Sequence, residues 1–286
     1  MDKIYIARYG RGEGKKQEGG SAFWRLLLAA AVILLLAAGA LAAAVELYPP
    51  QGMLILEYHK VNDRMNDDYT VSTKDFAAQM DFLQAEGYTT VSVLDFLRAK
   101  KGKLKLPDKP VVVSFDDGYS DNYTEALPIL EKRGMKATVF MVTNDVGLPG
   151  YLTWDQLHEM EKRGVELGSH TANHLPLTNM TVDEARDEAQ KSKLMMEWKG
   201  LKTIFVLSYP NGQYDKYLPN ILKEEEYLAA VTGDAGLNTF QTNPYLLHRT
   251  NIPRPYLGTA EFRLRIWKAK AMTLLGLWQN TGDLRP

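Results

Sequence analysis

Residues 111–119 read Val-Val-Val-Ser-Phe-Asp-Asp-Gly-Tyr, a mostly β-branched apolar run that stops at two carboxylates and a glycine. An apolar run of this kind is typical of a parallel strand that is buried on both faces. Gly118 lets the backbone turn directly after the strand. The stretch therefore predicts a central strand of an α/β fold that carries Asp116 and Asp117 at its carboxyl end.

Similar runs alternate with amphipathic segments along the chain. The expected strands are 53–58, 89–91, 111–115, 137–142, 165–167, 204–207, 228–231 and 246–252. Two of the intervening helices carry start signals, Ser92 with Asp95 and Thr181 with Glu184. Seven or eight strands in the 239 residues from Tyr48 onward favour one closed or nearly closed (β/α) barrel over a doubly wound sheet.

Polar residues follow these strands, as the side chains of a barrel's active site do. The residues at expected strand ends are Tyr58, His59, Asp116, Asp117, His170, Tyr209, Pro210, His248 and Arg249. The chain has no cysteine, so a metal must be held by carboxylates and the five histidines. His170 and His174, expected four residues apart on a helical turn, can share one ion with Asp117. The plainer alternatives are an Asp-Gly turn and two solvated histidines.

The amino-terminal part of the chain predicts a membrane anchor. Residues 26–45 form 20 positions without a charge, which is enough to span a bilayer as a helix. Residues 1–25 carry six basic and three acidic residues, so we expect a cytoplasmic tail. The prediction is a tail at 1–25, a single span at 26–47 and an extracytoplasmic domain at 48–258, located at the cell membrane. A cleaved signal peptide is the alternative, because 40–44 offers small residues for cleavage.

The net charge of the whole chain is -1, which argues against a nucleic-acid partner.

The carboxyl-terminal stretch 259–286 is expected to form an amphipathic helix. Helical spacing places on one stripe Leu264, Trp267, Ala271, Leu274, Leu275 and Trp278. We expect this amphipathic helix to pack on the barrel through that stripe, or to lie on the membrane surface.

Three motifs in fixed order resemble the polysaccharide deacetylases of carbohydrate esterase family 4. They are Ser-Phe-Asp-Asp-Gly-Tyr at 114–119, His-Thr-x-x-His at 170–174 and Tyr-Pro-x-Gly at 209–212. The resemblance, over about 54–252, implies a distorted (β/α)7 barrel and metal-dependent hydrolysis of N-acetyl, sometimes O-acetyl, groups on a glycan. It implies that Asp117, His170 and His174 bind a divalent metal, zinc first, with cobalt, nickel or manganese as alternatives.

The same resemblance implies the catalytic roles. Asp116 would be the general base, and the backbone amide of Asn211 would bind the oxyanion. His248, which follows a leucine on a late strand, would be the general acid. The chain departs from many members at Ser208, where they carry an arginine that orients the catalytic aspartate. Arg249 could supply that charge from another side, or could itself be the functional residue of its strand.

The segment Glu57-Tyr58-His59-Lys60-Val61 resembles the branch that deacetylates poly-β-1,6-N-acetylglucosamine. His59 would then line the barrel mouth, or simply bond to a loop. Tyr119, Tyr209 and Pro210 are the other expected substrate contacts, and core packing is the alternative for Tyr119. The expected partners are an extracytoplasmic N-acetylated glycan and the bilayer. An O-acetyl esterase and a glycan-binding pseudoenzyme are the competing functions.

Overall fold

The computed structural model describes residues 19–277, with side chains from Phe23 onward, and it divides the chain into two compact units, Met1–Leu47 and Tyr48–Pro286. The described part of the first unit, residues 19–47, is the helix α1 (Gly19–Leu47). Its stretch Phe23–Leu47 is long and apolar enough to cross a membrane. The helix begins before the expected span at 26, and most of the expected tail, 1–18, lies outside the described residues.

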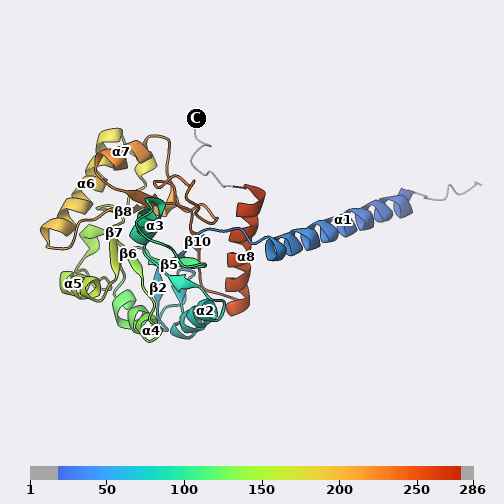
Figure 1. The fold of residues 1–286 in the computed structure, drawn as a ribbon, viewed down its shortest axis with the longest axis horizontal. Coiled ribbons are helices and arrows are strands. Elements are labelled where there is room, and N and C mark those ends of the chain that lie inside the picture. Colours follow the sequence, from blue (N-terminus) through green and yellow to red (C-terminus); the bar gives the residue numbers. More distant parts are fainter. Residues whose placement is uncertain (1–18, 278–286) are drawn as a thin grey trace, which may run out of the picture. The chain divides into compact units, whose positions relative to one another are not determined.

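The second unit is built around one parallel sheet (Figure 1). The strand order is β10-β1-β5-β6-β7-β8-β9, and β4 pairs with β5 at its amino end. The strands are β1 (Leu54–Tyr58), β4 (Thr89–Thr90), β5 (Pro110–Phe115), β6 (Thr138–Met141), β7 (Glu166–Ser169), β8 (Val206–Ser208), β9 (Ala229–Val231) and β10 (Thr250–Asn251). A separate pair, β2 (Lys60–Val61) and β3 (Thr70–Val71), was not predicted.

The segment at 247–251 connects the two edges of the curved sheet. Leu247 forms an isolated bridge with Val231 of β9, and Thr250 pairs with Leu56 of β1. Only two of its residues form a regular strand, fewer than the expected 246–252. The (β/α)-barrel prediction is confirmed in the form of a curled parallel sheet with seven strands along its path.

Helices surround this sheet (Figure 1). They are α2 (Thr73–Ala85), α3 (Val93–Lys100), α4 (Leu127–Glu131), α5 (Trp154–Lys162), α6 (Val182–Trp198), α7 (Leu218–Glu224) and α8 (Thr259–Leu275), with shorter turns η1 (Asn122–Ala126), η2 (Thr143–Asp145), η3 (Leu177–Asn179) and η4 (Pro210–Gly212). Both predicted helix starts form capping boxes, Ser92 with Asp95 and Thr181 with Glu184. Each box satisfies amide groups that the first turn leaves without a partner.

Apolar side chains fill both sides of the sheet. On the inner side, Ile55, Val112 and Phe140 pack with Phe96 of α3. The amino terminus of α3 is held by Glu166, the first residue of β7, whose carboxylate accepts the amide hydrogens of Val93 and Leu94 at 2.9 Å each. Helix α3 therefore covers the amino ends of the strands and leaves the opposite end, where Asp116 lies, for a site.

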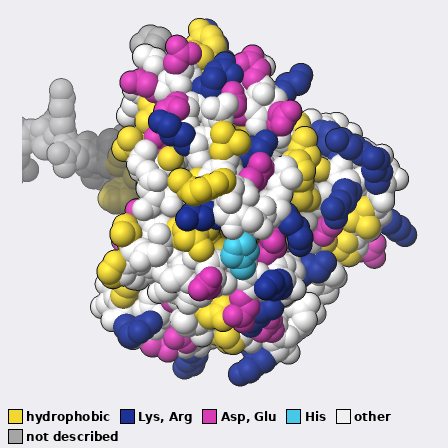
Figure 2. Space-filling view, turned by 90° about the vertical axis from the view of Figure 1, so that its left-hand side faces the viewer, with side chains coloured by type: hydrophobic (Ala, Val, Ile, Leu, Met, Phe, Trp, Pro, Cys, Tyr) yellow, Lys and Arg dark blue, Asp and Glu magenta, His cyan; other side chains and the backbone are white. Residues whose placement is uncertain are grey.

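Helix α8 packs on the barrel, but among the described residues of the expected stripe only Ala271 is buried. Its buried face is Phe262, Ile266, Ala269, Ala271 and Met272, and Phe262 meets Phe82 of α2 edge-on at 5.8 Å. Of the expected stripe, Leu264, Leu274 and Leu275 are exposed, Trp267 is partly buried, and Trp278 lies outside the described residues. The helical spacing of apolar residues did not identify the buried face, because this helix is apolar on two faces. The molecular face in Figure 2 mixes acidic, basic and hydrophobic side chains, in keeping with the small net charge.

Candidate active site

Two aspartates leave β5 in different directions. The Asp116 amide donates to the carbonyl of Tyr58 at 2.9 Å, so Asp116 still belongs to the β1–β5 ladder. Asp117 and Gly118 then take φ values of 70° and 77° in the left-handed region. That region is costly for a non-glycine residue and is often found at functional sites. The turn leaves Asp116 buried and exposes part of Asp117.

The predicted metal ligands lie together. Oδ1 of Asp117 is 3.5 Å from Nε2 of His170 and 3.4 Å from Nε2 of His174. The three residues each offer a ligand atom within 4.8 Å of the others. Oδ1 of Asp117 is buried and has no hydrogen-bond partner among the described residues. A buried acceptor without a donor is costly, and a cation between these three atoms would satisfy it.

The protonation of His170 suits a metal ligand. Its Nδ1 lies 2.8 Å from the carbonyl of Ser208, which can only accept, so we place the proton on Nδ1. Nε2 then presents a lone pair toward Asp117. Burial lowers the pKa of His170 below its usual value, although Asp116 and Asp117 act in the opposite direction. A neutral ring with a fixed tautomer is the form that binds a metal.

The two histidines do not lie on a helical turn, as the sequence suggested. Residues 170–176 form an irregular loop, and Thr171 and His174 have φ values of 67° and 56°. The amide of His174 donates to Oγ1 of Thr171 at 3.1 Å. Glu188 of α6 holds the middle of the loop, because its carboxylate accepts from the amide of Asn173 at 3.0 Å and from its Nδ2 at 2.5 Å. Side-chain anchoring, rather than helical periodicity, brings the rings together.

Arg249 supplies the charge that Ser208 lacks. Its Nη1 donates to Oδ1 of Asp116 at 2.8 Å, and Ser208 Oγ donates to Oδ2 at 3.1 Å. Burial by itself raises the pKa of Asp116, but the charge of Arg249 and the hydrogen bond that it donates lower this pKa below the usual range. Asp116 is therefore ionised at neutral pH. The expected contribution of Arg249 from the late strand is confirmed as a contact.

His59 lies beside the same carboxylate. Glu57, His59 and Asp116 each offer a ligand-type atom within 4.8 Å of the others. Oε2 of Glu57 is also 3.3 Å from Nε of Arg249, so the guanidinium bridges two acids. Sequence reasoning missed Glu57, because an acid inside an apolar strand run gave no pattern of its own. Its position two residues before a strand-end histidine was the available signal.

His248 has a different environment from His59. Its side chain is 8% exposed, and burial lowers its pKa to about 4. A histidine with that pKa is neutral at pH 7, so it lacks the imidazolium proton that a general acid would give to the leaving amine. The neighbouring backbone is fixed by Asn238, whose Oδ1 accepts from the His248 amide at 2.8 Å. The structure thus places His248 among buried groups and does not favour it as the general acid.

The remaining predicted contacts divide into two groups. The ring of Tyr119 is partly exposed, stacks on Tyr151 at 5.2 Å, and has Lys60 4.7 Å from its centroid. These three residues line a cavity of about 610 Å³. Tyr209 and Pro210 are buried, and the Tyr209 hydroxyl donates to the carbonyl of Tyr245 at 3.1 Å. The expectation that their side chains contact substrate is therefore wrong, because neither has a surface to offer.

The turn that follows Tyr209 is under local constraint. Asn211 is exposed and has a φ of 56°. Gly212 has a φ of 64°, and a Cβ there would lie 2.4 Å from the backbone nitrogen of Gly233. Glycine is thus required at 212, which fixes how the Asn211 peptide is presented.

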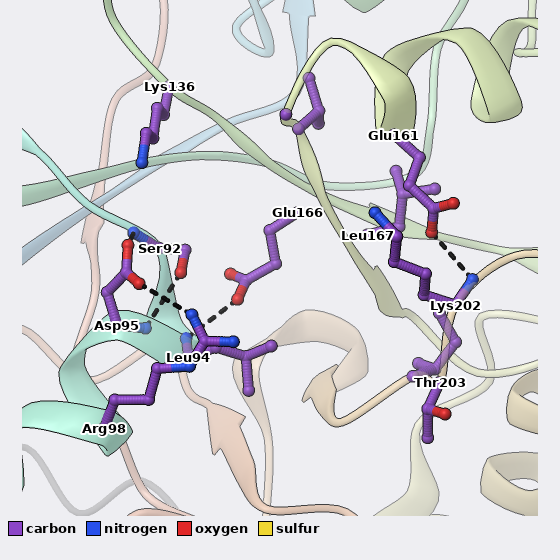
Figure 3. Close-up of a pocket in the computed structure, with 13 residues that line it drawn as sticks. Ser92, Leu94, Asp95, Arg98, Lys136, Glu161, Glu166, Leu167, Lys202 and Thr203 are labelled. Atoms are coloured by element: carbon purple, nitrogen blue, oxygen red, sulfur yellow. Dashed lines mark hydrogen bonds and ion pairs between the residues drawn. The ribbon is translucent and has the colours of Figure 1, made fainter. Parts of the chain in front are cut away.

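A second pocket lies at the opposite end of the barrel and has a structural explanation. Its lining includes Ser92, Arg98, Lys136, Glu166 and Lys202 (Figure 3). The carboxylate of Glu166 points toward the start of α3 and also accepts from Thr138 Oγ1 at 2.7 Å. Glu166 caps a helix there, so we assign no chemistry to this pocket.

Comparison with known proteins agrees with this site. Residues 103–230 match the family model described as polysaccharide deacetylase. YxkH of Bacillus subtilis (strain 168), itself assigned to the polysaccharide deacetylases, is 32% identical over 219 residues, covering 77% of this chain and 78% of that protein. The poly-beta-1,6-N-acetyl-D-glucosamine N-deacetylase of Escherichia coli (strain K12) is 32% identical over 148 residues, 46% of this chain but only 22% of that protein.

A solved structure shows the same fold. The Streptococcus pyogenes deacetylase PplD, in complex with acetate, superposes with a TM-score of 0.70 and 26% identity, covering 77% of this chain and 99% of that one. The identity to YxkH extends over most of both chains, and the family match includes Asp116, Asp117, His170 and His174. The chain therefore belongs to the polysaccharide deacetylase family.

Proposed function

We propose that this protein is a membrane-anchored, metal-dependent deacetylase that removes N-acetyl groups from an N-acetylglucosamine-containing polysaccharide outside the cytoplasm. The observation that carries the proposal is the buried, unpartnered Oδ1 of Asp117, facing the ring nitrogens of His170 and His174. This cluster lies directly beside the ionised Asp116. A cation site next to a buried carboxylate is the arrangement that amide hydrolysis by activated water requires.

Each residue of the site has a role in this reaction. Asp117, His170 and His174 would hold a divalent cation, which would polarise the acetamide carbonyl and make the attacking water more acidic. Asp116 accepts the proton of the attacking water on Oδ2, the oxygen that faces His170 at 3.6 Å. Once Oδ2 is protonated, the Ser208 hydroxyl can keep its hydrogen bond to this oxygen, because a hydroxyl can accept as well as donate. Arg249 stays on Oδ1 and keeps the carboxylate in place.

The leaving amine needs a proton, and we assign its delivery to His59. His59 is partly exposed and lies beside Asp116, whereas burial keeps His248 neutral. The backbone amide of Asn211, an exposed residue, binds the oxyanion in this proposal. The C–N bond then breaks, and the products are acetate and a free amine on the glycan.

The substrate and the location rest on separate observations. Tyr119 and Tyr151 offer aromatic faces at the cavity beside Asp117, and such faces suit the apolar faces of sugar rings. The Escherichia coli relative is named for poly-beta-1,6-N-acetyl-D-glucosamine. Zinc is the metal we favour, because an Asp/His/His set with open positions is typical of catalytic zinc. The apolar stretch Phe23–Leu47 and the basic residues before it support the anchor and its orientation.

Paired variants of the two aspartates test the proposal. Asp116→Asn should retain the metal but lower acetate release about 10²–10⁴-fold, because only the base is lost. Asp117→Asn should lose metal and activity together. Acetate release from acetylated glycans, with metal analysis of the same samples, measures both.

The same assay separates the competing functions. A glycan-binding pseudoenzyme would release no acetate even with added zinc or cobalt. An O-acetyl esterase would release acetate from O-acetylated glycan and leave the amide intact. Full activity of Asp116→Asn would refute Asp116 as the base.

A further inference from the structure

The point where the chain enters the catalytic unit lies at the amino end of the sheet. Met53 directly precedes β1 and exchanges two backbone hydrogen bonds of 2.8 Å with Asn238. The site residues Asp116 and Asp117 follow the carboxyl end of β5, which runs parallel to β1. Whatever surrounds Met53 is therefore on the opposite end of the barrel from the candidate active site.

A basic loop lies beside this entry point. Residues 100–105 contain Lys100, Lys101, Lys103 and Lys105 and no acidic residue, and all four side chains are exposed. Leu106, farther along the same loop, lines a cavity of about 330 Å³ together with Gln51, Met53, Asp108 and Phe240. Lys100 Nζ also donates to the carbonyl of Thr242 at 2.9 Å. The loop thus adjoins both the entering chain and the turn at 238–242.

Exposed apolar side chains surround the same point. Leu104 is 42% exposed and Phe240 is 49% exposed. The end of α8 is adjacent, because Thr273 Oγ1 accepts from the amide of Leu237, next to Asn238, at 2.8 Å. There Leu275 is 52% exposed. We call this set the basal surface; it consists of Lys100, Lys101, Lys103, Leu104, Lys105, Phe240, Leu274, Leu275 and Leu277.

We propose that the basal surface docks on an anionic lipid bilayer and directs the active site away from the membrane. This proposal rests on the membrane anchor that the proposed function includes. Only residues 48–53 separate α1 from β1, so the chain lets the first strand begin no farther than about 25 Å from the end of the span. Residues 46–286 carry 28 basic and 32 acidic residues, so an anionic surface selects the lysine-rich end of an otherwise acidic unit. The neighbouring leucines and Phe240 suit the interfacial zone.

The orientation has a direct consequence for substrate. The metal ligands would face outward, beyond the full length of the strands from the bilayer. Glycan chains that extend into the surrounding matrix or wall would then be accessible, whereas acetyl groups close to the lipid headgroups would not.

Single-cysteine labelling of the full chain tests the docking, and the absence of native cysteine keeps the background clean. The protein is placed in nanodiscs of phosphatidylcholine with or without 30% phosphatidylglycerol and a trace of headgroup-nitroxide lipid. A fluorophore is attached at Leu104→Cys or, as the matched control, at Leu148→Cys. Leu148 is 50% exposed and lies in the loop after η2, on the active-site end.

We expect nitroxide quenching at position 104 to exceed that at position 148 by about threefold or more in anionic discs. Lys101→Glu/Lys103→Glu/Lys105→Glu should abolish most of this excess, as should neutral lipid. Equal quenching at both positions, or stronger quenching at 148, would overturn the proposal. So would an excess of quenching at 104 that has the same size in neutral and anionic discs. Failure of the protein to stay with the discs would overturn the anchor and the docking together.

Acetate release from a soluble acetylated oligosaccharide is measured on the same samples. The triple lysine variant should retain it within about twofold, because none of these lysines touches the active site. No acetate release from any sample, with the quenching difference intact, would refute the deacetylase and leave the docking in place.

Discussion

Asp116 and Arg249 are 133 positions apart in sequence and form a buried ion pair at the centre of the site. Both side chains are almost completely buried, at 3% and 1% exposure. Removing one partner of such a pair leaves an uncompensated charge in a poor solvent. Ser208 alone cannot replace the guanidinium, because one neutral hydrogen bond is weaker than a charge-assisted one.

Arg249→Met should therefore reduce both stability and activity. We expect a loss of about 3–5 kcal/mol in the free energy of unfolding, because Asp116 is left buried and unpaired. Denaturant unfolding measures this loss. Arg249→Lys keeps the charge and should recover part of both properties, since lysine lacks the planar fork that contacts Asp116 and Glu57 together. Unchanged stability in the methionine variant would contradict this account of the pair.

Helix α6 supports the candidate metal-binding residues without providing one of them. Glu188 accepts two hydrogen bonds from Asn173 in the loop between His170 and His174. Ser192, one turn later, has its hydroxyl 2.8 Å from that of Ser169, which also accepts from the amide of Thr171 at 3.1 Å. The helix thus fixes a loop that contains two left-handed residues.

Glu188→Ala should weaken metal binding about 10–100-fold, because supporting residues of this kind orient the ligands. Competition with a metal chelator measures the affinity directly. Asp187→Ala is the matched control, since Asp187 is the exposed neighbour that pairs with Lys191 on the same helix. Equal metal affinity in the two variants would show that α6 does not hold the loop.

The elements show what sequence could and could not predict. The β-branched run of β5 and the capping box of α6 depend on neighbouring residues, and both were predicted correctly. The loop at 170–174 was not, because its shape depends on Glu188, a contact across 15 positions. Helix α8 was assigned the wrong buried face because it carries apolar residues on both. Glu57 was missed because only the folded barrel brings it to Arg249.

At the scale of the whole molecule, buried histidine links stability to pH. The pKa of His248 is lowered to about 4 in the folded state, against 6.5 ordinarily. Between these values the unfolded chain binds more protons than the folded one, so acid favours unfolding. The contribution of His248 is complete above pH 6.5 and is lost as pH falls toward 4. A shift of this size corresponds to about 3 kcal/mol.

His248→Asn should therefore flatten the pH dependence of unfolding. Its free energy of unfolding should fall less between pH 6.5 and 4 than that of the native chain, in denaturant titrations at each pH. Acetate release at pH 7 should stay within about twofold, because we assign the proton donor to His59. A large loss of kcat with unchanged stability would instead restore His248 as the acid.

The bridging segment at 247–251 also determines when catalysis becomes possible. It is the last stretch of the sheet in sequence, and it pairs with β1, which lies almost two hundred residues earlier in the chain. Contacts of such long sequence separation form slowly, because loop closure must precede them. Arg249 reaches Asp116 only when this closure is complete. The catalytic centre is thereby incomplete in any chain whose carboxyl-terminal part has not joined the sheet, because Asp116 then lacks its buried cation.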